Sequence, residues 1–431
     1  MLAANHVINC KKMVSSEIGI LSKLVKLPLL NQDPSIRGYG IWPCDTSAFS
    51  NEKFGGRSSG CGTSWDEALL GTVGETAERY ASAFYNLEEA TLSSYKDLKQ
   101  KAIHPSEFAL FHEEQHKHPN FLIIPFDEEA EVNWFETTDL TNGGEKVLCP
   151  GAFIYLPWTA DNQWITLTTS TGLAAHTNIH KAMLTGMYEL IERDSFTITW
   201  VQKLVPPKIV LSKDVTDYIH SIFPTHYEWH FFDITYDLKE PSVLGFCVGH
   251  ADFGKFVAVG SSTRSTMAEA LQKTAKEIGQ GVGYFRHLMG EKKDWQPSDN
   301  FFEIMDFEQH SIFYTKRQDL WHVFDDYFNA KETRVVDMHE KCELTDAEKL
   351  KRMFKTFKDK NYNVLFKDIT TPDINQMGFY AVRMFVPQLI PMSGAYPFYF
   401  NGGKRLYEVP KLMGYTSNDY ANLNPYPHPF P

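Results

Sequence analysis

Two stretches of the chain carry the same ionisable residues, in which two glutamates stand three positions apart and an arginine follows the second. These residues are Glu75, Glu78, Arg79, Glu189, Glu192 and Arg193. In a helix, positions three and four apart share one face, so each stretch would present its carboxylates and guanidinium together. Taken alone, each stretch is most simply a set of salt bridges within one helix.

The repetition favours a second interpretation, a binding site for a divalent cation. The step from Glu75 to Glu189 equals the step from Glu78 to Glu192, so both stretches hold the same register. Four carboxylates converging from two helices would repel one another strongly unless a cation lay between them. An oxygen-only donor set suits Mg²⁺, which keeps several waters and bridges to substrate phosphates. We therefore expect the four glutamates to face a magnesium ion.

Both stretches lie in segments with the apolar periodicity of a helix. Residues 60–84 repeat apolar side chains three and four positions apart, at Leu69, Val73, Ala77, Tyr80 and Phe84. Residues 179–200 do the same with Ser195 in the row, at Leu184, Met187, Ile191 and Ile198. The glutamates fall on the opposite face in both segments. The second segment is apolar nearly all round, which predicts a buried helix.

The flanking sequence predicts how these helices begin. Ser64, with Glu67 three residues later, forms a capping box after the glycine-rich loop 55–62. A β-rich segment, 131–168, and the small-residue loop 166–170 precede the second helix. Each acidic helix thus follows a strand and a loop, an arrangement that brings helix N-termini together. Backbone N–H groups of a glycine-rich loop can also approach a phosphate.

A third helix is expected after Thr266, which forms a capping box with Glu269. Its polar row consists of Lys273, Glu277, Gln280 and Tyr284. Taken alone, such a row is typical of a solvated helix face.

The rest of the chain reads as a mixture of helices and strands. Residues 1–50 predict strands or a short helix packed on the main body, and residues 87–130 predict a solvated surface excursion. The further expected elements are strand, helix and strand over 208–235, two strands over 242–262, a polar, weakly periodic stretch over 291–345, a helix over 348–360, and strands over 362–369 and 379–387. This order predicts an α/β (α+β) protein.

The composition excludes several classes of protein. The 431 residues carry a net charge of −12, with acids and bases well mixed, so no basic footprint for nucleic acid is present. The six cysteines are scattered without a C-x-x-C pair, which argues against a zinc site and suits a reduced compartment. The sequence shows neither a signal peptide nor an apolar run long enough to span a membrane. We expect a soluble, cytoplasmic protein.

The last nine residues, 423–431, read LNPYPHPFP. Alternating prolines impose an extended conformation that cannot enter a helix or a central strand. A disordered tail or a docking motif for a partner is one interpretation. The aromatic residues between the prolines favour another, in which this stiff tail inserts into its own protein at modest entropic cost.

Together these features resemble the YcaO family of ATP-using enzymes that activate backbone amides. The residues that carry the resemblance fall in three motifs: Gly60, Gly62, Ala68, Gly74, Glu75, Glu78 and Arg79; Ser170, Gly172, Ala174, Glu189, Glu192 and Arg193; and Ala270, Leu271, Lys273, Glu277 and Gln280. The terminal P-x-P-x-P and the segment R-L-Y-E-V-P at 405–410 resemble the azoline-forming branch, the cyclodehydratases of thiazole/oxazole-modified microcins, of the D-protein type. The chain departs from the pattern at Cys61 and His176, which puts local phosphate contacts in doubt.

The resemblance implies a YcaO-type fold, with paired acidic helices packed on mixed β-sheets around a nucleotide site. It divides the chain into an N-terminal extension, 1–54, and a cyclodehydratase domain, 55–431, that ends in the tail. It implies Mg²⁺ ligands at Glu75, Glu78, Glu189 and Glu192. It implies ATP contacts at Arg79, Arg193, Glu277, Gln280 and Ser170. It also implies that Pro427, Pro429 and Pro431 reach and shape the catalytic site.

The implied reaction converts Cys, Ser or Thr of a ribosomal precursor peptide into thiazoline or oxazoline rings, with phosphorylation of the backbone amide oxygen by ATP. The resemblance further implies a homodimer, a separate leader-binding partner, since no such domain precedes residue 50, and a downstream FMN oxidase. Two alternatives remain open. One is another YcaO reaction, amidine or thioamide formation, and the other is a non-catalytic ATP-binding scaffold with a docking tail.

Overall fold

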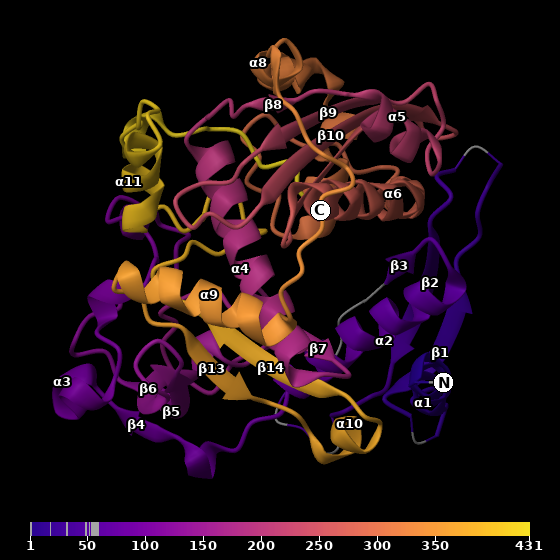
Figure 1. Ribbon diagram of the computed structural model, residues 1–431. Coiled ribbons are helices and arrows are strands. Elements are labelled where there is room, and N and C mark those ends of the chain that lie inside the picture. The colour runs from indigo at the N-terminus through magenta and orange to yellow at the C-terminus, as the bar shows by residue number, and fades with distance from the viewer. Residues whose placement is uncertain (1, 18, 32, 48–49, 51, 53–59) are drawn as a thin grey trace.

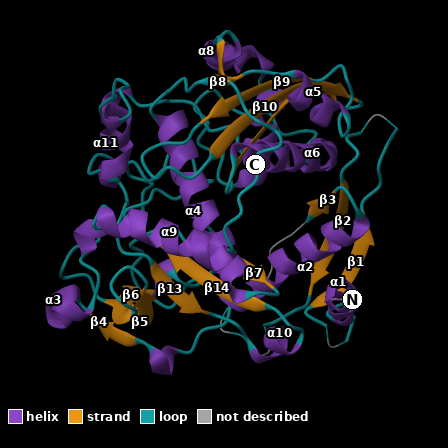
Figure 2. Ribbon diagram, in the orientation of Figure 1, coloured by secondary structure: helices purple, strands orange, loops and turns teal. Residues whose placement is uncertain are grey.

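A computed structural model describes residues 2–17, 19–31, 33–47, 50, 52 and 60–431. Three β-sheets and the helices packed on them make up the molecule (Figures 1 and 2), which confirms the expected α/β class. Most of the predicted loop 55–62 lies outside the described residues, and only its last three residues can be placed.

The N-terminal sheet contains three antiparallel strands. Its strands are β1 (Leu21–Lys26), β2 (Arg37–Pro43) and β3 (Cys61–Gly62), and helix α1 (Leu2–Lys12) precedes them. Helix α2 (Trp65–Ser82), which carries the first acidic stretch, packs on β2 and β3. Leu21, Tyr39, Leu69 and Val73 share one buried cluster there. Strands or a short helix were predicted for residues 1–50, and the described part of this region contains both, packed on α2. The boundary at residue 54 stays a prediction.

A six-stranded antiparallel sheet lies beneath the second acidic helix in Figure 1. Its strands run in the order β4 (Thr91–Ser93), β5 (Val132–Asp139), β13 (Leu365–Asp368), β14 (Tyr380–Phe385) and β7 (Leu173–His176), with β6 (Glu145–Pro150) paired to β5. Helix α4 (Ile179–Val201) starts three residues after β7 and packs back on β7 and β14. A strand does precede α4, but it lies at Leu173–His176, after the loop predicted over 166–170, so the predicted order of strand and loop is wrong.

A five-stranded sheet lies at the other end of α4. Its order is β11 (Gly254–Thr263), β10 (Ser242–Ala251), β9 (Glu228–Asp233), β8 (Lys208–Ile209) and β12 (Glu332–Arg334), in which β8 and β12 are parallel and the other pairs antiparallel. Helix α5 (Lys213–His220) connects β8 to β9, and α6 (Met267–Glu291) packs on β10 and β11. Because α4 contacts β11 as well as β14, it ties the two larger sheets together (Figure 1).

The remaining helices cover the ends of these sheets. They are α3 (Tyr95–Leu98), α7 (Phe307–Lys316), α8 (Asp325–Phe328), α9 (Asp346–Asp359), α10 (Pro372–Gln376) and α11 (Lys404–Leu412). Short 3-10 helices occupy Leu87–Glu89, Lys99–Lys101, Pro105–Glu107, Gln115–Lys117, Gly151–Phe153, Gln318–Phe324 and Tyr420–Asn422.

Two stretches are more ordered than the sequence indicated. Residues 87–130 contain β4, α3 and short 3-10 helices, and Phe108, Phe111, Phe121 and Ile123 are buried, so the expectation of a solvated excursion is wrong there. Aromatic side chains spaced without helical or strand period gave no signal of burial. Residues 291–345 contain α7 and α8, although their polar composition showed little periodicity.

The predicted capping box of α2 forms only in part. Ser64 accepts a hydrogen bond from the backbone N of Glu67, at 3.2 Å, as expected. The Glu67 carboxylate instead accepts from Thr63 N at 2.9 Å and pairs with Lys276 of α6 at 2.8 Å. One oxygen of Glu67 therefore bonds one residue before the N-cap, and the other pairs with α6.

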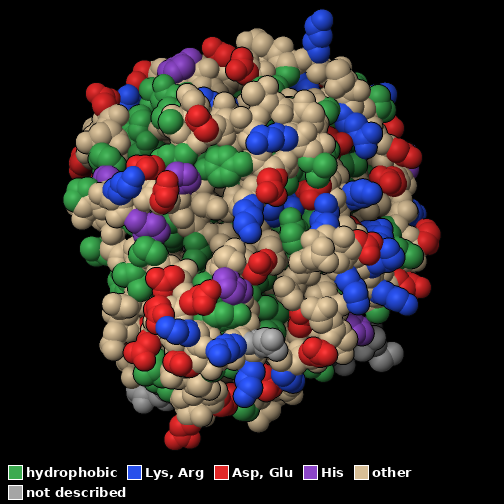
Figure 3. Space-filling view, turned by 90° about the vertical axis from the view of Figure 1, so that its left-hand side faces the viewer, with side chains coloured by type: hydrophobic (Ala, Val, Ile, Leu, Met, Phe, Trp, Pro, Cys, Tyr) green, Lys and Arg blue, Asp and Glu red, His purple; other side chains and the backbone are tan. Residues whose placement is uncertain are grey.

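The surface carries charges of both signs. On the face shown in Figure 3, acidic and basic side chains alternate without a continuous field of either sign. Among the helices of the described residues, none is both long and apolar enough to cross a bilayer.

Candidate functional site

The two acidic stretches adopt the same local geometry on α2 and α4. The Arg79 guanidinium lies 4.0 Å from Glu75 and 3.3 Å from Glu78. On α4, Arg193 lies 3.7 Å from Glu189 and 3.9 Å from Glu192. Each acidic stretch therefore forms the salt bridges within one helix that its sequence predicts.

The stretches also act on one another across the space between the helices. Burial raises the pKa of the Glu78 carboxyl well above its ordinary range, Arg79 opposes this rise, and the charges of Glu189 and Glu75 add to it. Helices α2 and α4 both pack on β7, and the charge of Glu189 is close enough to act on Glu78. The equal register read from the sequence therefore corresponds to proximity in space.

Glu192 is the most buried of the four glutamates, with 8% of its side chain exposed. Burial raises its pKa to about 8, and the nearby Glu277 of α6 contributes to the rise against Arg193 and Arg264. Its carboxylate accepts a hydrogen bond from Thr263 N at 3.3 Å. The third helix therefore faces the same site, so its polar row is not simply a solvated face.

Glu189 is oriented by the turn that precedes β7. Its carboxylate accepts a hydrogen bond from the backbone N of Gly172, at 3.2 Å. Gly172 has a φ of +93°, and a Cβ there would lie 2.2 Å from the carbonyl oxygen of Met384. Both the left-handed backbone and the close approach of β14 require glycine at this position. This explains physically why the stretch S-x-G precedes the acidic helix.

Helix α6 contributes an ion pair and a neighbouring amide. Lys273 lies 3.1 Å from Glu277, and the charge of Glu277 raises the pKa of the Lys273 amine. Gln280 follows Glu277 on the same helix and is half-buried. Ser170 is half-buried in the turn before β7, where its carbonyl accepts from Leu173 N at 2.9 Å. The ATP contacts expected of Gln280 and Ser170 stay predictions.

The four glutamates do not form one compact ligand set. Among the described residues, no group of three or more His, Cys, Asp or Glu side chains stands close enough together to hold a metal ion. The carboxylates lie instead against Arg79 and Arg193, which reduce the repulsion between them. The four glutamates therefore lie in two arginine-paired clusters, and their convergence on one Mg²⁺ ion stays a prediction.

The residues nevertheless fit a divalent cation. All the donors are carboxylate oxygens, the type that Mg²⁺ prefers. Burial of Glu78 and Glu192 makes their charged forms costly, as their raised pKa values show, and a cation would offset this cost. The buried Nε of Arg193 has no hydrogen-bond partner within the described part of the chain, so the arginine retains a donor for a further group.

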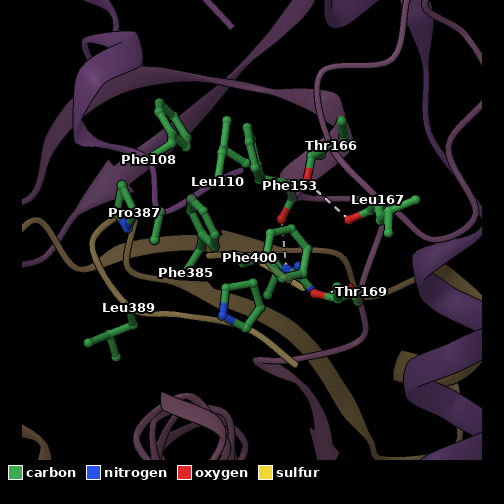
Figure 4. A pocket seen from close by; sticks show the side chains of 14 residues that line it. Phe108, Leu110, Phe153, Thr166, Leu167, Thr169, Phe385, Pro387, Leu389 and Phe400 are labelled. Atoms are coloured by element: carbon green, nitrogen blue, oxygen red, sulfur yellow. Dashed lines mark hydrogen bonds between the residues drawn. The ribbon is translucent and has the colours of Figure 1, made fainter. Parts of the chain in front are cut away.

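Sequence reasoning did not identify Arg383 of β14. Its side chain is buried, and it donates from Nε to Phe153 O at 2.8 Å and from Nη1 to Thr169 O at 3.0 Å. It lies in a narrow pocket whose aromatic rings come from Phe108, Phe153, Phe385 and Phe400 (Figure 4). Burial lowers its pKa to about 10, and the charges of Glu189 and Glu78 oppose that shift. An arginine inside the apolar run FYAVRMFVP was the available signal.

The proline-rich tail runs alongside α4 inside the protein. Four side-chain donors from three segments, two of them on α7, bind four successive tail carbonyls. These bonds are Tyr396 to Pro425 O at 2.6 Å, Trp200 to Tyr426 O at 3.1 Å, Tyr314 to Pro427 O at 2.8 Å and His310 to His428 O at 2.7 Å. The prediction that the tail inserts into its own protein is confirmed.

The end of the tail meets the second acidic stretch. Pro427 and Pro429 are buried and Pro431 is half-buried. The Arg193 guanidinium lies over the ring of Phe430, 4.7 Å from its centroid. Arg193 therefore contacts the tail on one side and Glu189 and Glu192 on the other. The catalytic role of the three prolines stays a prediction. The tail segment that contains them contacts Arg193, which pairs with the carboxylates.

Comparisons with known proteins identify the family and the fold of the chain. Residues 59–390 match the family described as YcaO cyclodehydratase, ATP- and Mg²⁺-binding. A comparison with curated proteins gives no match. Among solved structures, a heterocyclase in complex with substrate and cofactor has a TM-score of 0.79 at 18% identity, over 99% of this chain and 57% of that one.

Two shorter structures are covered almost completely. YcaO from Methanopyrus kandleri, bound with AMPPCP and Mg²⁺, has a TM-score of 0.61 at 14% identity, over 93% of this chain and 94% of that one. The E. coli microcin synthetase McbBCD complex gives 0.58 at 16%, over 88% and 90%. The chain spans about half the length of the heterocyclases it matches, 57% and 50%. At these identities the likeness shows the fold, whereas the family match covers most of the chain. The chain belongs to the YcaO cyclodehydratase family, whose members bind ATP and Mg²⁺.

Proposed function

We propose that the protein is an ATP-dependent peptide cyclodehydratase that makes thiazoline or oxazoline rings from Cys, Ser or Thr of a ribosomal precursor peptide. The observation that carries the proposal is the position of Arg193. This residue contacts the terminal segment through Phe430 and the acidic pair Glu189 and Glu192 through its guanidinium. A tail seated at a nucleotide-type site fits an enzyme better than a docking protein, because prolines that bind a partner domain must be exposed.

The reaction activates an amide oxygen, which is otherwise a poor leaving group. The thiol or hydroxyl of the substrate attacks the preceding amide carbonyl carbon and gives up its proton. The resulting oxyanion takes the γ-phosphoryl group of ATP, and ADP leaves. The C–O bond then breaks, phosphate carries away the former amide oxygen, and loss of the nitrogen proton forms the C=N bond. The sum is azoline, ADP and phosphate from peptide and ATP.

The residues of the site would contribute positioning and charge neutralisation. Glu75, Glu78, Glu189 and Glu192 would hold Mg²⁺, which neutralises phosphate charge when bound. Arg79 and Arg193, already paired with these carboxylates, would turn their remaining donors toward phosphate oxygens.

Glu277 and Gln280 of α6 and Ser170 would line the nucleotide pocket. Lys273 holds Glu277 in place. The seated prolines, Pro427, Pro429 and Pro431, would close the side of the pocket next to Arg193 and limit the access of water to the activated oxygen.

The proposal extends to partners and location. A precursor peptide is the substrate, a separate leader-binding protein presents it, an FMN oxidase acts afterwards, and the enzyme works as a homodimer in the cytoplasm. The six unpaired cysteines of the chain support a reducing compartment. The alternative reaction is amidine or thioamide formation. The contacts of the proline-rich tail favour ring formation over this alternative.

The test follows the amide oxygen. The enzyme is incubated with ATP, Mg²⁺ and peptides containing Cys, Ser or Thr, with ¹⁸O in the preceding amide carbonyl. We expect a peptide mass loss of one water and ¹⁸O in the released phosphate. Glu189→Gln serves as the inactive control. Unlabelled phosphate, or ATP turnover with no peptide mass change in the presence of a leader-binding partner, would contradict the proposal.

A further inference from the structure

A separate cavity lies away from the acidic faces, between the start of α4, the turn after β5 and one side of α9. Its volume is about 400 Å³. Its floor is apolar and consists of Leu140, Met183, Leu350 and Phe354. Its basic residues are His180, Lys351, Lys355 and Lys358. The size falls within the range of cavities that bind ligands.

Two parallel rows of residues on α9 line the cavity, and the buried Leu350 belongs to the first of them. Ala347, Leu350 and Phe354 follow the spacing i, i+3, i+7, and all three line the cavity. The second row consists of Lys351, Lys355 and Lys358, at i, i+4 and i+7. Residues with these spacings lie above one another on a helix. The cavity therefore has an apolar strip bordered along its length by a basic strip.

The basic row is a local exception in an acidic protein. The chain carries a net charge of −12, yet these three lysines are exposed side by side. Lys355 pairs with Asp359 at 2.7 Å, whereas Lys351 and Lys358 form no ion pair with any residue that the structure describes. The first turn of α4 also lines the cavity, and the positive end of a helix dipole adds to the basic potential there. A complementary ligand is acidic along one side and apolar along the other.

We propose that this cavity docks an acidic amphipathic helix from a partner polypeptide. The helix lies along α9, places apolar side chains on Leu140, Met183 and Phe354, and presents carboxylates to the three lysines. In this binding mode an amphipathic helix lays its apolar face in a hydrophobic groove. A flat anionic bilayer would contact the lysines but leave the concave floor unfilled. The proposal does not depend on the reaction, since the cavity uses neither the acidic stretches nor the tail.

The probe is a fluorescent synthetic helix of about the length of α9, with leucines at i, i+3 and i+7 and glutamates along the adjacent row. A second peptide of the same composition has its leucines and glutamates out of phase. The proteins are wild type, the triple variant Lys351→Glu, Lys355→Glu, Lys358→Glu, and a matched triple variant at exposed lysines elsewhere, Lys213→Glu, Lys331→Glu, Lys411→Glu. Binding is measured by fluorescence anisotropy. A thermal melt of each variant confirms that it is folded.

We expect the phased peptide to bind wild type and the matched variant with similar affinity. The cavity variant should bind at least roughly tenfold more weakly, because three attractions become repulsions. The out-of-phase peptide should bind no better than buffer controls. The proposal is overturned if the phased peptide does not bind, if both peptides bind equally, or if anionic phosphatidylglycerol vesicles bind the three lysines while neither peptide does.

Discussion

His310 of α7 and His428 of the tail stack face to face inside the protein, with ring centroids 3.7 Å apart and planes 9° apart. His310 Nδ1 donates to the carbonyl oxygen of His428, and His428 Nδ1 accepts from the backbone N of Phe430 at 3.3 Å. His428 Nε2 donates to Ser393 O at 2.9 Å. The pair therefore fixes the turn that places Phe430 on Arg193. Burial lowers the pKa of His310 to about 4, which keeps the ring neutral at ordinary pH.

Removing the hydrogen bond from His310 to the His428 carbonyl should displace the tail but leave nucleotide binding intact. We expect His310→Leu to lower kcat for peptide processing by roughly tenfold or more, since removal of one positioning interaction commonly has such an effect. The affinity for Mg²⁺–ATP should change little. His310→Gln keeps an N–H donor that can reach the His428 carbonyl, so it should restore most of kcat. Equal loss in both variants, or loss of ATP binding in step with kcat, would show a general folding defect instead.

The buried Glu192 predicts a pH dependence of nucleotide binding. Its pKa is raised to about 8 by burial and by Glu277, so the free protein holds a proton there at neutral pH. Magnesium needs the ionised carboxylate, and binding must therefore release this proton. Affinity for Mg²⁺–ATP should rise as the pH increases from 6 toward 8, in titrations at constant ionic strength. Glu192→Gln should bind weakly and show a flat profile over that range.

The same shift acts on the stability of the unliganded protein. The folded chain keeps the Glu192 proton between the ordinary glutamate value of 4.5 and about 8, whereas the unfolded chain loses it near 4.5. The folded state binds more protons than the unfolded state in this pH window. The free energy of unfolding therefore falls as the pH rises through the window. Glu192→Gln should remove that part of the fall in melting temperature. An unchanged slope in the variant would contradict the raised pKa.

A buried ion pair anchors the segment before the tail to α4. Arg405 of α11 donates to both carboxylate oxygens of Asp194, at 2.7–3.2 Å, and to Asp237 at 2.9–3.0 Å. Arg405→Leu would leave Asp194 buried and unpaired, which typically costs about 3–5 kcal/mol. Chemical denaturation should show this loss, while Lys213→Met, which removes an exposed pair with Asp217, should leave the midpoint unchanged. A small effect at Arg405 would mean that the segment is anchored by its apolar contacts.

Gly172 offers a test of the turn that orients Glu189. Gly172→Ala meets both an unfavourable φ of +93° and the Met384 carbonyl, so it should displace the turn and weaken Mg²⁺–ATP binding. Gly254→Ala is the matched control, because Gly254 has a φ of +109° but nothing lies within 4 Å of a Cβ there. The control should lose a similar amount of stability from backbone strain and retain nucleotide binding. Normal Mg²⁺–ATP binding by Gly172→Ala would show that the conformation of this turn is not needed for nucleotide binding.

The acidic helices were predictable because their information is local. Apolar periodicity and caps determined α2, α4 and α6, and the repeated glutamates indicated a shared site. The contribution of Arg383 could not be read in this way, since it depends on β14 lying between β13 and β7, a long-range pairing. The same holds for the tail donors. Trp200, the α7 pair His310 and Tyr314, and Tyr396 come from three segments far apart in sequence, and only the folded chain brings them to successive carbonyls. At the start of α2 the local signal held only in part, since Glu67 bonds Thr63 N instead of Ser64 N and also pairs with Lys276 of α6.

The central claim is that α2 and α4 form one Mg²⁺–ATP site, and a thermal-shift titration tests it most directly. Wild type should be stabilised by about 2.7 kcal/mol at a nucleotide concentration 100 times the Kd. Glu75→Gln and Glu189→Gln should each abolish most of this shift while remaining folded, whereas Glu136→Gln, at an exposed position on β5, should keep it. The double variant should lose no more than either single variant, because both residues serve the same site. A full shift in either single variant, or independent and additive losses, would contradict a shared site.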